Sequence, residues 1–451
     1  MHLVLDMRRK YYNLFAVAAV FLFLILGNNV RAESSSVDKQ GISFKAVREK
    51  AEKGVKDPIT GYRISWKEGL HLASPEENLM VKIGGKIILD GGNIDADDEL
   101  QRAFPDLDGG EFDFRDLSVD IFGTVYDSVD FRFEIDFANA SDIKDIWFRI
   151  SKNSYLKRFR FGHMKEPSSI EDQTGINSIT FMERALPVQA FSKGRNIGIR
   201  YDHPLSDSAI NWSAGMFLNS ESFGTLGEGS NQLSDANGIN LTARITGVPW
   251  YEKDGKKLMH LGFSYSHGFR DENDIILRAR PESRITDDRL VDTGKFKLDG
   301  IDRIGTEVAV VSGPLSFQGE GFYTLIDSAL KGDPEFWGAY AYLSYFVTGE
   351  HRKYSRSMGT FSFGEQYYQF RPREGGWGAW ELGMRYSYVD LNDAGINGGK
   401  ERNFTIGVNW YHQRNIRVML NYIRVNVKDR ASPSIENGRA NIFQTRFQII
   451  F

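Results

Sequence analysis

Residues 129–137, VDFRFEIDF, alternate without exception between large apolar and charged side chains. Because successive side chains of a β-strand point to opposite faces, this stretch predicts a strand with one apolar face and one charged face. A helix, with 3.6 residues per turn, would mix the two kinds on every side. Such a strand must lie between an apolar and an aqueous environment, either in the wall of a transmembrane β-barrel or over the core of a soluble sandwich.

The same period of two returns along the chain from residue 79 onward, and this repetition favours the barrel. We count about sixteen alternating segments, an even number, with lengths near the ~9–11 residues of a tilted membrane strand. The sequence therefore predicts an all-β fold, a transmembrane antiparallel β-barrel of about sixteen strands over residues 79–451. The predicted strands are 79–92, 111–126, 129–139, 142–151, 156–163, 194–202, 209–218, 238–248, 258–270, 303–312, 315–325, 337–348, 377–389, 402–411, 416–427 and 441–451.

The connections between these strands alternate between short and long. Short turns are expected at the periplasmic end of such a barrel and long polar loops at its outer end. Residues 349–376 fall on the short-turn side but are too long for a turn, so they either contain a missed strand pair or pack under the barrel. The predicted long loops are 93–110, 164–193, 219–237, 271–302, 390–401 and 428–440.

The final stretch, residues 441–451, alternates in the same way, with Phe443 and Phe447 on the expected lipid face. A closed barrel leaves no free edge strand. We therefore expect this strand to pair with the first one, residues 79–92.

The N-terminus has the three parts of a secretory signal. Residues 8–10 form a positive head, residues 14–26 are apolar, and residues 30–32 offer small side chains for cleavage. The apolar run is shorter than the ~20 residues of a spanning helix, which favours a cleaved signal over an uncleaved anchor. We therefore predict a signal peptide over residues 1–32, a short periplasmic N-terminal extension over residues 33–78, and localisation in the bacterial outer membrane.

Several stretches carry a resemblance to a known family. The most specific are TGEHR at residues 348–352 and GAWEL followed by RYS within residues 378–387. FRFGHMKEPSSIE at residues 159–171 and RARPES at residues 278–283 support them. Over roughly residues 62–451 the chain resembles the phosphate-selective porins O and P.

This resemblance implies a trimeric outer-membrane barrel of sixteen strands. Its third outer loop, which corresponds here to residues 164–193, would fold inward and narrow the pore, and basic residues would lead anions through it. We therefore expect a homotrimer in contact with outer-membrane lipid, and small inorganic anions as the solutes. The sequence does not separate a loop that narrows the pore from one that closes it.

The candidate pore-lining and anion-binding residues are basic side chains that the alternation places on the lumen side, or that belong to the 164–193 loop. Arginine suits phosphate because its planar fork donates two parallel hydrogen bonds, and lysine acts as a point charge. Arg158 and Arg160 form the best local basic ladder. The candidates are Lys82, Lys86, Arg132, Arg149, Arg158, Arg160, Arg200, Arg244 and Arg385 on the strands, Lys165, Arg184 and Lys193 in the loop, and Arg195 at its rim.

Acidic residues share this lumen face, so the two signs nearly balance. They are Asp90, Asp116, Asp120, Asp130, Glu134, Asp136, Asp145, Glu307, Glu320 and Glu381. The sequence predicts an outer-membrane porin that passes small anions by passive diffusion through a basic constriction, with phosphate or polyphosphate as candidate solutes. A general porin with a mixed-charge lumen, and a plugged structural or adhesive outer-membrane protein, are the alternatives.

Other chemistry finds little support in the sequence. Asp390, Asn392, Gly395 and Glu401 match four positions of a calcium loop, but Ala394 supplies no ligand oxygen at the fifth position and the stretch lies between strands. No nucleophile and base at catalytic spacing stand out, and a net charge of −4 does not indicate nucleic acid. We therefore expect no enzyme activity, no metal, no cofactor and no nucleic-acid partner.

Overall fold

The computed structural model describes residues 55–56, 58–66, 68–138, 142–153, 155–203, 210–219, 238–328, 332–363, 370–371 and 376–451. The predicted signal peptide, residues 1–32, lies outside the described residues, and so do residues 33–54 of the predicted extension. Among the described residues, no helix combines the length and the apolar character that crossing a bilayer requires.

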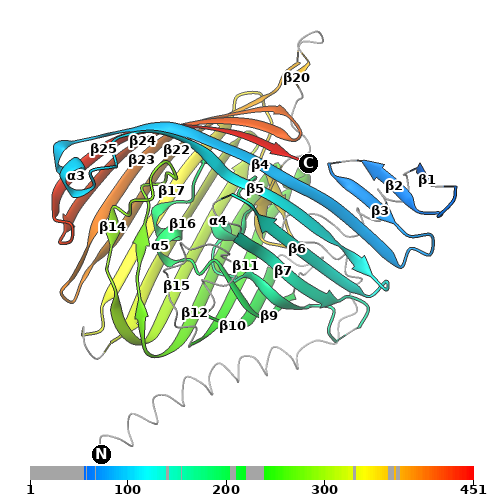
Figure 1. Cartoon of the computed structure of the whole chain (residues 1–451), viewed down its shortest axis with the longest axis horizontal. Coiled ribbons are helices and arrows are strands. Elements are labelled where there is room, and N and C mark those ends of the chain that lie inside the picture. Colours follow the sequence, from blue (N-terminus) through cyan, green and yellow to red (C-terminus); the bar gives the residue numbers. More distant parts are fainter. Residues whose placement is uncertain are drawn as a thin grey trace, which may run out of the picture. The chain divides into compact units, whose positions relative to one another are not determined.

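Sixteen antiparallel strands close into a barrel (Figure 1). The last strand pairs with the first, from Ala440 opposite Ala96 to Ile450 opposite Lys86. The predicted barrel, its strand number and the pairing of its ends are therefore confirmed. The strands are β4 (Leu79–Ala96), β5 (Gly109–Val125), β6 (Val129–Asp136), β7 (Asp142–Ile150), β8 (Phe159–Lys165), β9 (Arg195–His203), β10 (Ile210–Leu218), β11 (Ile239–Glu252), β12 (Lys257–Ile275), β15 (Phe296–Ser312), β16 (Leu315–Asp327), β17 (Glu335–Phe346), β22 (Ala379–Asp393), β23 (Ile396–Gln413), β24 (Ile416–Arg430) and β25 (Ile435–Ile450).

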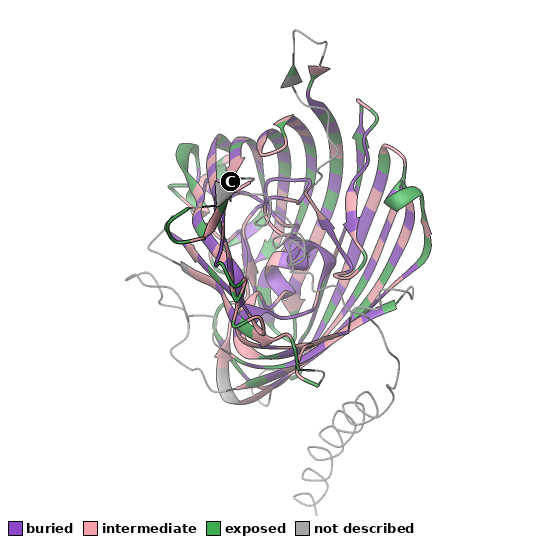
Figure 2. Cartoon of the chain, turned by 90° about the vertical axis from the view of Figure 1, so that its right-hand side faces the viewer, coloured by how far each residue is buried: buried purple, intermediate pink, exposed green. Residues whose placement is uncertain are grey.

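The alternation of the sequence becomes an alternation of burial along each strand (Figure 2). In β6, Asp130, Arg132 and Glu134 are buried inside the barrel, whereas Phe133 on the outer face is exposed. Large apolar side chains elsewhere on the outer face, such as Phe447 on β25, are exposed in the same way. Each strand thus separates a polar lumen from an apolar outer surface, as a membrane barrel requires.

Two of the predicted long loops are largely strand and a third is shortened at both ends by strands, which corrects their boundaries. β22 and β23 meet in a tight turn at Ala394 and Gly395, both with positive φ, so residues 390–401 form a hairpin. β24 and β25 likewise take up most of residues 428–440, and β12 and β15 extend into residues 271–302. Strand pairing can continue above the membrane, where both faces meet water and the apolar–polar alternation fades. The alternation therefore predicts the membrane part of a strand better than its full length.

Two segments enter the lumen from the long-loop end. Inner segment A, residues 166–194, follows β8 and carries two short helices, α4 (Ile170–Gln173) and α5 (Leu186–Phe191) (Figure 1). Inner segment B, residues 276–294, lies between β12 and β15 and forms a small hairpin of β13 (Arg278–Ala279) and β14 (Val291–Asp292). Both segments pack against lumen-facing residues of the wall in one buried apolar cluster, which includes Phe181, Leu186, Val188, Leu277, Val291, Phe336 and Ile423.

Residues 349–376 contain two short strand pairs that are not part of the barrel wall. β18 (Lys353–Ser355) pairs with β19 (Thr360–Ser362), and β20 (Phe370–Arg371) pairs with β21 (Gly376–Trp377). The first hairpin reaches lumen-facing side chains, because the Tyr354 hydroxyl lies 2.7 Å from Nδ1 of His260 on β12. The segment thus contains two strand pairs that are separate from the barrel sheet, and the first of them reaches into the lumen and does not pack under the barrel.

Four further elements, three short strands and one helix, lie outside the ring of sixteen strands. Before the barrel, β1 (Val55–Lys56) pairs with β2 (Arg63–Trp66), which forms a hairpin with β3 (Leu70–Ala73). β3 also pairs with the beginning of β4, where Leu70 lies opposite Ile83. The helix α3 (Asp98–Ala103) connects β4 to β5 and is capped by the Asp97 side chain.

Candidate functional site

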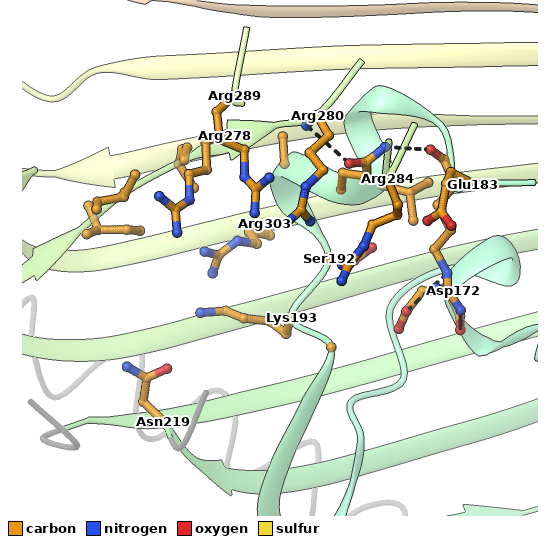
Figure 3. Close-up of a pocket in the computed structure, with 18 of the residues that line it drawn as sticks. Asp172, Glu183, Ser192, Lys193, Asn219, Arg278, Arg280, Arg284, Arg289 and Arg303 are labelled. Atoms are coloured by element: carbon orange, nitrogen blue, oxygen red, sulfur yellow. Dashed lines mark hydrogen bonds and ion pairs between the residues drawn. The ribbon is translucent and has the colours of Figure 1, made fainter. Parts of the chain in front are cut away.

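A cavity of about 380 Å³ lies between the two inner segments and the barrel wall (Figure 3). Basic side chains dominate its lining. Nine of the lining residues are basic and three are acidic, namely Arg115, Arg184, Lys193, Arg270, Arg278, Arg280, Arg284, Arg289 and Arg303 against Asp172, Glu183 and Asp274.

Inner segment B supplies four of the nine basic residues of this lining, more than inner segment A or the wall does. Its sequence RARPESR places Arg278 and Arg280 on alternate positions around β13, and Arg284 and Arg289 follow before β14. Figure 3 shows these arginines in a row along the cavity, with Lys193 of segment A on its other side. The hairpin thus aligns guanidinium groups that a free loop would leave scattered.

The positive charge of this row is only partly neutralised. Asp287 lies 2.5 Å from Nη2 of Arg280. Repulsion from Arg115, together with burial and the charge of Arg280, lowers the pKa of Arg284 to about 9. Burial and the charges of Arg280 and Arg278 lower the pKa of Arg289 to about 10. Both groups stay charged at neutral pH. For Arg284 the largest cause is repulsion from Arg115, which a bound anion would relieve.

Most of the basic residues predicted for the strands lie in ion pairs with the acidic residues of the wall. Arg132 donates hydrogen bonds to Asp120 (2.9 Å) and Glu134 (3.1 Å), and Lys86 donates to Glu134 (2.8 Å). The others follow the same rule: Arg149 pairs with Asp130 at 2.7 Å, Arg160 with Asp202 at 2.8 Å, Arg195 with Asp145 at 3.2 Å, Arg200 with Asp202 at 2.7 Å and Arg244 with Glu307 at 2.7 Å.

The predicted ladder of Arg158 and Arg160 is divided between the two faces of the wall. Arg160 faces the lumen, whereas Arg158, just before β8, lies 3.0 Å from Nε2 of His203 and 3.4 Å from the Tyr201 hydroxyl. Tyr201 and His203 stack with Trp212 on the outer face. Arg158 can turn outward because its side chain leaves the chain before the strand begins.

Of the predicted residues, Arg184 and Lys193 are the two that line the cavity. Nη2 of Arg184 donates to the backbone carbonyl of Thr174 (3.2 Å), inside segment A. Lys165 lies at the end of β8, with its Nζ 3.6 Å from Asp172 Oδ1. Nζ of Lys82 lies 5.6 Å from the centroid of the Phe122 ring.

A third group of wall arginines holds inner segment A in the lumen. Arg385 on β22 donates to the carbonyl of Glu183 (2.9 Å), and Arg417 on β24 donates to the carbonyl of Ile179 (2.9 Å). Arg446 on β25 binds Asp90 (2.6 Å) and the Glu183 carboxylate (2.8 Å). These arginines satisfy backbone and side-chain acceptors of an irregular buried segment, which would otherwise lack partners.

Seven basic residues of the cavity lining were not among the predicted residues: Arg115, Arg270, Arg278, Arg280, Arg284, Arg289 and Arg303. Arg115 lies within β5 at a register shift, between Phe114 opposite Leu89 and Asp116 opposite Ile88, where the alternation is interrupted. Inner segment B does not follow a period of two along its length. The clustering of four arginines within residues 278–289 is the local signal that could have found this part of the cavity.

Comparison with known proteins gives a consistent result. Residues 81–451 match the family model described as phosphate-selective porin O and P. Porin O of Pseudomonas aeruginosa is 22% identical over 435 residues, which cover 86% of this chain and 92% of that protein. An uncharacterized protein of Caulobacter vibrioides is 27% identical over 402 residues, which cover 86% of this chain and 77% of that protein.

Among solved structures, the high-pH structure of OprB from Pseudomonas putida is similar, with a TM-score of 0.52 and 11% identity. The match covers 93% of this chain and 100% of OprB. At this identity the likeness concerns the fold alone.

Proposed function

This chain belongs to the phosphate-selective porin O and P family and is a porin of the bacterial outer membrane, and on that basis we propose that its arginine-rich cavity selects small inorganic anions. The solutes would cross by passive diffusion, with the cavity as the basic constriction of the pore. The family and the fold are those of channel proteins.

The observation that carries this proposal is the charge of the cavity lining, nine basic against three acidic residues. A narrow passage with low-dielectric walls concentrates the field of such a lining, raises the local concentration of anions and repels cations. The ion pairs elsewhere on the wall contribute little to this field, because each guanidinium has a carboxylate beside it. The cavity is therefore the place where charge would act on a passing ion.

Phosphate fits this lining better than chloride does. A guanidinium offers a planar fork of donors that matches two oxygens of a phosphate, and several forks can bind one tetrahedral anion at the same time. Arg278 and Arg284 have no carboxylate within ion-pair distance among the described residues, so their donors are available to a solute. The row in Figure 3 also supports a second candidate solute, a short phosphate chain that spans several guanidinium groups.

The outer surface supports contact with outer-membrane lipid. Phe133, Leu343, Ile406 and Phe447 stand exposed on the outer face of the barrel, where they would meet acyl chains. We expect a homotrimer from the family, and sedimentation of the detergent-solubilised protein measures it.

Planar-bilayer recording of the full-length porin tests the proposal. In a KCl gradient we expect a reversal potential of the sign that chloride permeation gives, and we expect added phosphate to block the chloride current. A reversal potential of the opposite sign would overturn the anion assignment. Weak selectivity without phosphate block would favour a general porin with a mixed-charge lumen, and conductance near zero would favour a plugged structural or adhesive protein.

A further inference from the structure

Glu282 lies in the middle of the arginine-bearing stretch but points away from the cavity. Arg280 and Arg284, two residues to either side of it, line the cavity, whereas Glu282 is completely buried. Its backbone has a φ of +57°, and its N–H donates to the carbonyl of Arg280 (2.7 Å). A positive φ is unfavourable for a residue with a side chain, so other contacts must hold this turn.

The Glu282 carboxylate supplies those contacts. It accepts hydrogen bonds from the Leu186 N–H of inner segment A (3.1 Å) and from the Thr405 hydroxyl on β23 (3.1 Å). It also forms an ion pair with Arg385 Nη2 on β22 (2.7 Å). The backbone carbonyl of Glu282 accepts from Nε2 of Gln444 on β25 (3.2 Å). One residue thus joins the second inner segment to the first and to three strands of the wall.

A carboxylate is costly to bury unless its charge is paired and its oxygens are hydrogen-bonded. Glu282 meets both conditions, and a neutral glutamine at this position could not replace the ion pair with Arg385. The reach of the side chain matters as well, because its two oxygens serve partners on different elements. These requirements suit a residue that fixes geometry.

We infer that Glu282 is a positioning residue for anion selection: its carboxylate fastens the turn between Arg280 and Arg284 and so aims both guanidinium groups into the cavity. This inference rests on the proposed function of the cavity. It assigns to an acidic residue a supporting role in an anion-selective site.

The sign of the effect separates positioning from simple electrostatics. If Glu282 acted only through its charge, its removal would make the lumen more positive and would strengthen phosphate binding. If it positions Arg280 and Arg284, its removal lets the turn move and weakens phosphate binding in spite of the added positive charge.

The experiment compares phosphate block of chloride current in Glu282→Gln, Glu282→Asp and the unmodified full-length porin in planar bilayers. We expect roughly tenfold weaker block for Glu282→Gln, about the factor that one charge-assisted contact is worth. Glu282→Asp keeps the charge but shortens the reach, so a similar loss in this variant would report geometry alone.

Asp287→Asn is the matched control, because it removes the same charge from the same segment at an exposed carboxylate that pairs with Arg280. We expect equal or stronger block in this variant. The temperature at which each variant loses its oligomeric state in detergent shows whether its barrel is folded. If Glu282→Gln does not fold, the comparison with Glu282→Asp provides the test.

Unchanged or stronger block in both Glu282 variants, combined with weaker block in Arg284→Ala, would overturn the positioning role and leave the proposed function intact. Unchanged block in Arg280→Ala and in Arg284→Ala would instead contradict the proposed function itself. The two failures are therefore distinguishable.

Discussion

The barrel wall pairs its arginines with carboxylates, whereas the arginine row of inner segment B lies largely among other arginines. Elsewhere in the cavity lining, Arg115 pairs with Glu183 and Arg184 lies 3.6 Å from Asp172. On the wall, Arg132 is buried among Asp120, Glu134 and Asp145, all within 3.4 Å. In the cavity, the charges that act most on Arg284 belong to other arginines, Arg115 first. The comparison teaches that the number of basic residues in a lumen says little about its selectivity. What matters is whether each one has a carboxylate beside it.

Strand geometry explains the difference. Neighbouring strands bring side chains of the same face together at fixed spacing, and on this wall acids and bases meet across the ladder, as Asp130 does directly opposite Arg149. Such pairs connect strands and leave little net field. The inner segments are not bound to this register, so segment B can present several cations to one space while Glu282 turns its charge toward the wall.

The largest expected effect comes from the same substitution made in the two regions. Arg132→Met removes the partner to which Asp120 and Glu134 are bound, and we expect the free energy of unfolding to fall by about 3–5 kcal/mol. Arg284→Met removes a repelled charge, so we expect no loss of stability. Urea unfolding of the two variants folded into lipid vesicles measures both, and equal losses would contradict the comparison.

The second-largest expected effect is on phosphate block, and here the cavity variant should lose more than the wall variant. Arg280→Ala combined with Arg284→Ala removes two donors of the cavity, and we expect phosphate block to weaken by roughly 10- to 100-fold, as one or two charge-assisted hydrogen bonds are worth. Arg149→Ala combined with Arg160→Ala removes two neutralised cations from the wall and serves as control. Its block should stay within about threefold; a loss as large as that of the cavity pair would mean that the wall also binds the anion.

How much of this contrast the sequence predicts depends on the range of the interactions. The sixteen strands and the closure of the barrel follow from a period of two, which each strand carries in its own residues. The cavity does not, because Arg115, Arg303 and inner segment B come from distant parts of the chain and meet only in the folded barrel.

The sequence alone also does not show which charged side chains form ion pairs with one another. The alternation of side chains along the strand places Arg132 in the lumen correctly, but it does not reveal that Asp120 neutralises the charge of Arg132. The same alternation places Arg158 on the wrong face, because a residue before the beginning of a strand is not held to either face. The sequence therefore predicts which residues reach the lumen better than it predicts which of their charges are left without a neutralising partner.

A smaller effect tests whether the wall and the cavity communicate through Glu282 and Arg385. If their ion pair acts as a unit, Glu282→Gln combined with Arg385→Met should weaken phosphate block no more than Glu282→Gln alone, within about twofold. Block constants of the two single variants and the double variant complete the cycle. Strictly additive losses would show that Arg385 supports the cavity by another route, for example through its bond to the Glu183 carbonyl.

The smallest effect concerns Asp287, the carboxylate that pairs with Arg280 of the arginine row. Asp287 pairs with Arg280 from an exposed position, where a salt bridge is weak, so Asp287→Asn should raise the chloride-to-potassium permeability ratio by no more than about fivefold. The hydrogen bond from Arg280 lowers the pKa of Asp287, so the carboxylate stays charged at any pH above its ordinary value of about 4. Acidifying the unmodified porin from pH 7 to pH 5 should therefore not reproduce the increase. A rise of the ratio over that range would show that another acid, and not Asp287, sets the charge balance of the cavity.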